Sequence, residues 1–234
     1  MYIDTHCHLQ LPQLLERADD VITRAQEVGV QQFIVPGTNV ETSQLAINLS
    51  EQHEGVYAAV GMHPEDVPVI PVRQLAETRD PVSTNEMLKP ASTSRMRGEQ
   101  VQHDIDKIES FLIHPKVVAI GEVGLDNYMS FSPRNGVRGK LRRESIIPNI
   151  LDPRDFVPQC GTQPEDDNRL KLQKDILIKQ IQLAVRYKKA LILHSRETAE
   201  EMIKILFENW NEALKNRTVL HCCEASDNLF AFAK

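Results

Sequence analysis

The chain has 234 residues, of which 41% are hydrophobic and 26% are charged, an ordinary composition for a soluble globular protein. Its net charge of −6 argues against a nucleic-acid binder that depends on a basic surface, although bound metal ions can hold a phosphate on an acidic protein. No apolar run is long enough to span a bilayer, so we expect no membrane contact.

Short apolar segments typical of strands alternate with longer segments that have the periodicity of amphipathic helices. Strands are predicted at 2–5, 32–35, 56–60, 117–120, 190–193 and 218–220. Helices are predicted at 11–28, from about 38 to 53, at 101–113, at 169–187 and from 198 to about 214, with a further helix under way at the last residues. Two of these helices begin with a capping-box pattern, formed by Thr38 with Glu41 and by Thr198 with Glu201.

Six strand–helix units in sequence predict an α/β fold with a parallel sheet covered by helices. An open doubly wound sheet and a TIM (β/α)8-type barrel both have this pattern. The first strand is not followed by a Gly-rich phosphate loop, and polar residues end many strands, which favours a barrel that is incomplete at about six units. We expect one domain over 1–234, with irregular insertions at 83–100 and 129–168.

Histidines gather at the predicted strand ends. His6 and His8 follow the first strand, and alternation along an extended chain turns both rings to one face. Further strand ends carry His63, Glu122, His194 and His221, whereas His53, His103 and His114 fall in helices or loops. Because the carboxyl ends of barrel strands meet at one face, which is where barrel enzymes have their active sites, we expect the strand-end group to form a site.

Histidines with one carboxylate are the ligands that zinc-like or manganese-like divalent ions prefer. Four histidines are more than a single open catalytic metal site requires. A carboxylate at Glu122 that bridges two ions would use all of them, and a pair of ions can hold a phosphate and activate a water molecule.

Five segments carry this chemistry in a fixed order: Asp4-Thr5-His6-Cys7-His8, Gly61-Met62-His63-Pro64, Gly121-Glu122-Val123-Gly124-Leu125-Asp126, His194-Ser195-Arg196 and His221-Cys222. In this combination they resemble the TatD-like metal-dependent deoxyribonucleases, a TIM-barrel family within the amidohydrolase-like superfamily. The resemblance covers nearly the whole chain outside 83–100 and 129–168, and it implies hydrolysis of phosphodiester bonds in DNA.

The resemblance also implies a role for each residue. His6 and His8 would bind a first divalent ion, and His194 and His221 a second, with either Mg, Mn or Zn as the metal. Glu122 would bridge the two ions and serve as the catalytic carboxylate. His63 and Arg196 would contact the substrate phosphate or orient a metal ligand. DNA is the expected substrate, with no obligate protein partner.

The family pattern also includes an Asp after an eighth strand that binds the first ion, and this sequence has no such run. We therefore expect a truncated barrel, or one completed by another chain, unless Asp126 or Glu224 replaces that Asp. The alternative functions are a C–N or lactone hydrolase of the wider superfamily and an inactive remnant that only binds metal or a partner. With four scattered cysteines and no predicted export signal, the expected location is the cytoplasm or, in a eukaryote, the nucleus.

Overall fold

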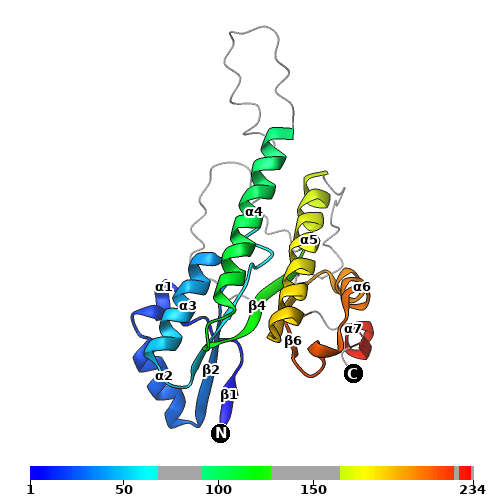
Figure 1. The fold of residues 1–234 in the computed structure, drawn as a ribbon. Coiled ribbons are helices and arrows are strands. Elements are labelled where there is room, and N and C mark those ends of the chain that lie inside the picture. The colour runs from blue at the N-terminus through cyan, green and yellow to red at the C-terminus, as the bar shows by residue number, and fades with distance from the viewer. Residues whose placement is uncertain (68–90, 128–163, 224–226, 233–234) are drawn as a thin grey trace, which may run out of the picture.

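The computed structural model of this chain describes residues 1–67, 91–127, 164–223 and 227–232 (Figure 1). Six strands lie in these ranges: β1 (Tyr2–Asp4), β2 (Val30–Pro36), β3 (Val56–Val60), β4 (Val117–Asp126), β5 (Ala190–Arg196) and β6 (Thr218–His221). The helices are α1 (Pro12–Leu15), α2 (Ala18–Glu27), α3 (Val40–Gln52), α4 (Ala91–Phe111), α5 (Pro164–Tyr187), α6 (Ala199–Asn209), the 3-10 helix η3 (Glu212–Leu214) and α7 (Asp227–Phe232).

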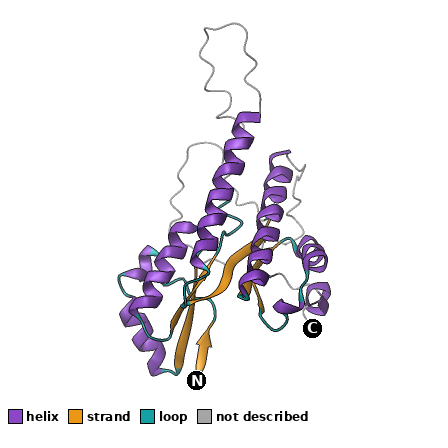
Figure 2. Cartoon of the chain, viewed as in Figure 1, coloured by secondary structure: helices purple, strands orange, loops and turns teal. Residues whose placement is uncertain are grey.

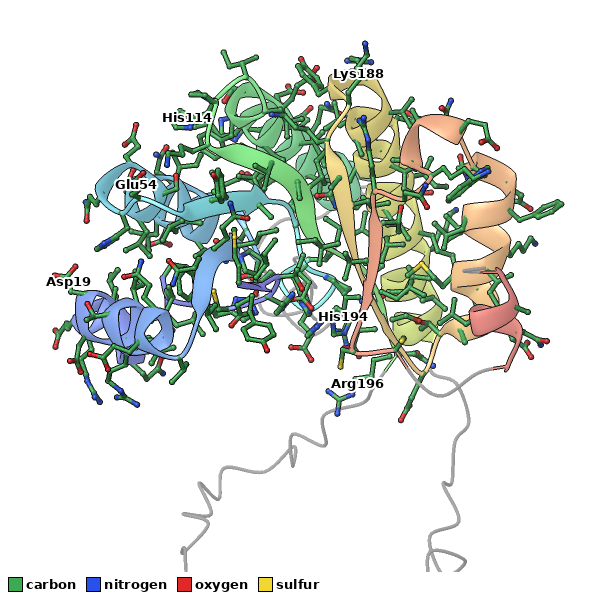
Figure 3. The ribbon with its side chains drawn as sticks, turned by 90° about the horizontal axis from the view of Figure 1, so that it is seen from below. Asp19, Glu54, His114, Lys188, His194 and Arg196 are labelled. Carbon is green, nitrogen blue, oxygen red and sulfur yellow. The ribbon has the colours of Figure 1, made fainter. Side chains whose placement is uncertain are left out.

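The six strands form one parallel sheet in the order β1-β2-β3-β4-β5-β6. Each strand is added on the same side of its predecessor, whereas a doubly wound sheet reverses direction at a switch point. Figures 2 and 3 show the strands following a curve, with the helices along its outer side. The predicted α/β fold of barrel type, with about six units, is confirmed, and the assignment of 1–234 to one domain stays a prediction.

The sheet is apolar at its centre because its inner strands are covered on both faces. In β3 the side chains of Val56, Ala58 and Val60 are fully buried, and in β4 those of Val117 and Ile120 are as well. The edge strand β1 differs, because all three of its residues are exposed. The inner strands therefore carry the core of the sheet, and the carboxyl ends of the strands carry the side chains described below.

Several predicted boundaries were wrong. The helix predicted at 11–28 divides into α1 and α2, because Arg17 has backbone angles of φ −119° and ψ 14°. The capping box of α3 is formed by Asn39 and Thr42 instead of Thr38 and Glu41. Thr198 does occupy the N-cap position of α6, but its side chain makes no capping hydrogen bond.

The two predicted insertions were also drawn too long. Residues 91–100 belong to α4, where strong helix formers such as Ala, Arg, Met, Glu and Gln outweigh the cost of Gly98. Residues 164–168 belong to α5, which begins at Pro164, and proline favours the first position of a helix. The rest of the insertion calls, 83–90 and 129–163, lies outside the described residues. No described helix combines the length and apolarity needed to cross a membrane.

Two isoleucines near the end of α4 test how the helices stabilise the sheet. Ile108 is 0% exposed and Ile113 is 80% exposed. We expect Ile108→Ala to lower the free energy of unfolding by about 2–5 kcal/mol, because it leaves a cavity in the core. Ile113→Ala should change it by less than about 0.5 kcal/mol. Urea denaturation of both variants measures the difference, and equal effects would contradict this packing.

Candidate functional site

The buried carboxylate of Glu122 in β4 lies at the centre of a group of histidines. Only 3% of Glu122 is exposed. Five ring nitrogens surround its two oxygens: Oε2 lies 3.2 Å from His6 Nε2 and 3.5 Å from His8 Nε2, and Oε1 lies 2.8 Å from His194 Nδ1, 3.5 Å from His221 Nε2 and 3.6 Å from His63 Nε2. Every predicted strand-end histidine is therefore brought to the same carboxylate.

The other three histidines lie elsewhere, as expected. His53 faces Asp19 at 3.5 Å, His114 faces Glu51 at 3.2 Å, and His103 is exposed on α4. Strand-end position, and not histidine content as such, predicted which rings would gather.

The parallel sheet explains how distant residues meet. His6 and His8 follow β1, His63 follows β3, and His221 ends β6. Glu122 and His194 lie inside their strands, because β4 continues to Asp126 and β5 to Arg196, beyond the predicted ends at 120 and 193. These strands continue where the sequence turns polar.

The rings of His6 and His8 come together, as predicted, although β1 itself ends at Asp4. The chain stays beside β2 here, because the N–H of Cys7 donates to the carbonyl of Ile34 at 3.1 Å. The Nε2 atoms of the two histidines lie 3.1 Å apart, with the rings nearly perpendicular at 82°. The ring of His221 stacks on that of His6, with centroids 3.6 Å apart and planes 8° from parallel.

Hydrogen bonds from the loop after β2 fix the backbone at two of these positions. The N–H of Glu122 donates to the carbonyl of Gly37 at 2.9 Å, and the N–H of His63 donates to that of Thr38 at 2.7 Å. One short loop thus holds the backbone of both residues.

Two glycines let β4 approach β5 closely beside Glu122. A Cβ at Gly124 would collide with the carbonyl oxygen of His194, and the backbone of Gly124 has φ +156°. A Cβ at Gly121 would lie 2.6 Å from Cβ of Ile192, closer than real contacts. The Gly-Glu-x-Gly spacing is therefore required for Glu122 and His194 to meet.

Burial and hydrogen bonding act in opposite directions on Glu122. Burial raises the pKa of the carboxyl, but hydrogen bonds from the histidines, led by His194 and His6, outweigh it and hold the pKa far below its ordinary value. The carboxylate is therefore ionised. Burial lowers the pKa of His221, and the neighbouring His6 lowers it further. His221 thus stays neutral, which is the form that binds metal ions.

Asp126 joins the site through His194. Its Oδ2 lies 2.9 Å from His194 Nε2, so the imidazole has a carboxylate at each nitrogen, and Asp126 is only 2% exposed. Burial lowers the pKa of His194, but hydrogen bonds to Glu122 and Asp126 outweigh it and raise the pKa above the ordinary value. The sequence suggested Asp126 only as a substitute for an absent ligand. One signal in the sequence could have found it: Asp126 lies four residues after Glu122, and both residues belong to the same strand.

Two sets of ligand atoms could hold a metal ion within the described part of the chain. One consists of His6, Glu122 and His221, and the other of His63, Glu122 and His194. In each set the ligand atoms lie within 4.8 Å of one another. Glu122 is common to both sets, as expected of a bridging group, whereas the division of the histidines between ions stays a prediction.

Arg196, the other expected substrate contact, ends β5 on the same side of the sheet as His194 (Figure 3). Its carbonyl accepts a hydrogen bond from the N–H of Asn127 at 3.0 Å, which ties the ends of β4 and β5 together.

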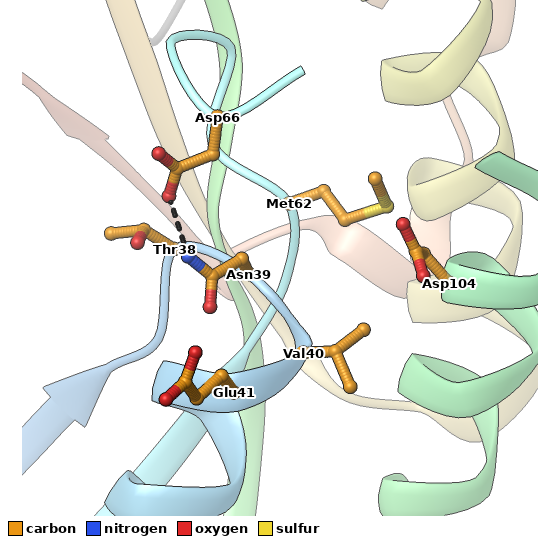
Figure 4. A pocket seen from close by; sticks show the side chains of 7 residues that line it. All are labelled: Thr38, Asn39, Val40, Glu41, Met62, Asp66 and Asp104. Carbon is orange, nitrogen blue, oxygen red and sulfur yellow. Dashed lines mark hydrogen bonds between the residues drawn. The ribbon is translucent and has the colours of Figure 1, made fainter. Parts of the chain in front are cut away.

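A small cavity of about 160 Å³ lies beside the site, between the start of α3 and the end of β3 (Figure 4). Its charged lining consists of Glu41, Asp66 and Asp104, and Asp66 accepts a hydrogen bond from the side chain of Asn39 at 3.0 Å. Three carboxylates make this flank unfavourable for an anion.

Residues 3–232, which include the barrel-type sheet and the buried Glu122 with its histidines, match the family described as TatD related DNase, and the chain belongs to that family.

Three known proteins illustrate the similarity. The "uncharacterized metal-dependent hydrolase YabD" of Bacillus subtilis is 25% identical over 97% of this chain and 62% of its own length. The "3'-5' ssDNA/RNA exonuclease TatD" of Salmonella typhimurium is 24% identical over 95% of this chain and 60% of its own. The crystal structure of YjjV, a TatD homologue from Escherichia coli, is 23% identical in sequence and superposes with a TM-score of 0.62, which shows the shared fold. The match covers 99% of this chain and 65% of the YjjV chain. The chain spans about three fifths of the length of the curated relatives.

The role of Asp126 can be tested on His194. Asp126→Asn should lower the pKa of His194, because it removes one of the two carboxylates that face the ring. With its raised pKa, His194 contributes to the free energy of unfolding below about pH 6.5, and this contribution is lost as the pH rises through the folded-state pKa. NMR titration of the metal-free chain measures the pKa. Asp106→Asn, on the exposed side of α4, is the control, and a pKa unchanged by Asp126→Asn would contradict the assignment.

Proposed function

We propose that this chain is a metal-dependent hydrolase that cleaves phosphodiester bonds in DNA, in the cytoplasm or, in a eukaryote, the nucleus. The observation that carries the proposal is the buried carboxylate of Glu122, faced by five imidazoles that come from four strands or the residues directly after them. The activity named for the Salmonella relative supports the choice of a nucleic-acid substrate.

The donor set fits divalent ions. The two oxygens of a carboxylate have about four lone pairs that can accept hydrogen bonds. Five imidazole N–H groups would need five acceptor sites, so hydrogen bonds alone cannot satisfy all five rings. Neutral imidazoles that share one carboxylate are instead suited to zinc or manganese. The residues that would hold two ions are His6, His8, Glu122, His194 and His221, with Glu122 between them. Such ions supply charge stabilisation for a phosphate and lower the pKa of a bound water.

The remaining groups of the chain would bind and orient the substrate. The N–H of Glu65 donates to His63 Nδ1 at 3.1 Å, so a neutral His63 carries its proton on Nε2, the nitrogen that faces the site. His63 therefore offers an N–H donor for a phosphate oxygen. Arg196 at the end of β5 offers a guanidinium, which pairs well with phosphates.

The charged residues around the site favour one path for the approach of the substrate. The carboxylates of Glu41, Asp66 and Asp104 lie around the cavity between α3 and α4 and repel a phosphate backbone. Arg196 lies on the β5 side. We infer that the DNA strand enters over β5, away from the acidic cavity.

Chelation tests the proposal. The chain as purified should cleave a labelled single-stranded oligonucleotide, lose that activity on dialysis against a chelator, and regain it with Mn²⁺, Mg²⁺ or Zn²⁺. Glu122→Gln should lower cleavage at least about a hundredfold and reduce metal content, since even residues that only support metal ligands cost 10–100-fold. Glu51→Gln is the matched control, because Glu51 also faces a histidine, His114, outside the site. Full cleavage in excess chelator, or turnover of amide or lactone substrates with none of DNA, would contradict the proposal.

Protons should compete with the metal. Imidazoles bind ions only when neutral, so the affinity for Zn²⁺ should fall as the pH is lowered, with a log–log slope of about two protons or more per ion. His194 should compete first, because its pKa is raised. Glu122 should not contribute to this slope, because its pKa lies far below the range. Calorimetric titration across the pH range measures the affinity. An affinity that is constant from about pH 7.5 to 5.5 would exclude the histidines as ligands.

A further inference from the structure

Helix α5 turns two glutamines into the interior of the protein. Gln173 is 1% exposed and Gln180 is 0% exposed, although glutamine is usually a surface residue. They are seven residues apart, about two helical turns, and so lie on one side of α5. That side faces the ends of β3 and β4, which lead to the histidine site.

Gln173 bonds to both strand ends. The N–H of Asp126 donates to Gln173 Oε1 at 3.1 Å, and Gln173 Nε2 donates to the carbonyl of Asp126 at 3.2 Å. The same Nε2 donates to the carbonyl of Pro64 at 3.0 Å. One side-chain amide thus joins the residue that faces His194 to the residue that follows His63.

Gln180 bonds to the residue before His63. The N–H of Met62 donates to Gln180 Oε1 at 2.8 Å, and Gln180 Nε2 donates to the carbonyl of Met62 at 3.4 Å. Each glutamine therefore bonds to both backbone groups of one residue, much as a neighbouring strand does.

These bonds begin where the pairing of β3 with β4 ends. The last paired residues of those strands are Val60 and Ile120. Beyond them the buried backbone groups of Met62, Pro64 and Asp126 still need partners. A glutamine amide has an acceptor and two donors but no charge, so it can provide them without adding a charge beside Glu122.

We propose that Gln173 and Gln180 are positioning residues that replace the ended β3–β4 pairing and hold His63 and the Asp126–His194 pair around Glu122. This inference rests on the proposed function, because it assigns the glutamines to a metal site. A glutamine that served stability alone would leave the metal affinity of the folded chain unchanged.

The test replaces each glutamine by methionine, which has a similar unbranched shape but cannot replace the amide. In the metal-free chain, Gln173→Met should speed amide hydrogen exchange at Asp126, and Gln180→Met should speed it at Met62. Zn²⁺ titrated into the folded chain should bind about 10–100-fold more weakly to Gln173→Met, because it loses support for His194. Gln182→Met, at an exposed position of the same helix, should match the wild type in both measurements.

The two measurements test separate parts of the proposal. Unchanged exchange at Asp126 and Met62 would overturn the hydrogen-bond assignment, and unchanged Zn²⁺ affinity in Gln173→Met would overturn the positioning role. If Gln173→Met does not fold, Gln173→Glu takes its place. It keeps an acceptor for the Asp126 N–H, loses the donor to Pro64, and should also weaken Zn²⁺ binding. A wild-type chain that binds no Zn²⁺ would refute the proposed function and with it the positioning role, while the exchange data would still judge the hydrogen bonds.

Discussion

The ionised carboxylate of Glu122 is the interaction on which the rest of the site depends. A buried charge is strongly unfavourable unless hydrogen bonds or opposite charges compensate it. Here the compensation comes from imidazoles on β5 and β6 and after β1 and β3. The close approach of β4 to β5 at Gly121 and Gly124 and the backbone hydrogen bond to Gly37 all serve to keep this one group in place.

Much of the fold followed from the sequence because its signals are local. Alternating strand and helix periodicity identified the six strands that the structure describes, and the shared edge of a parallel sheet explained why histidines far apart in sequence meet. The predicted strand boundaries were wrong where the apolar strand pattern in the sequence ends before the strand itself does. β4 and β5 continue through Glu122 and His194, which are polar, because hydrogen bonding to each other sustains both strands to Asp126 and Arg196.

The supporting shell of the site could not be predicted in this way. Gln173 and Gln180 fit an amphipathic helix as ordinary polar positions, and only the packing of α5 against the strand ends gives them a role. Asp126 likewise required the knowledge that β4 extends that far. Residues that meet a site through tertiary contact have no spacing signature, whereas strand-end residues have one.

If the proposed function holds, the net charge of −6 makes substrate binding depend on metal binding. Without ions, the site centre holds the ionised carboxylate of Glu122, and the carboxylates of Glu41, Asp66 and Asp104 lie on the flank. A phosphate would meet a repulsive field there. Divalent ions at Glu122 reverse the sign of the local charge, and a bound ion is often the largest charge in its site. Binding of a polyanion is then conditional on prior binding of metal, so an acidic chain can act on nucleic acid without any general affinity for it.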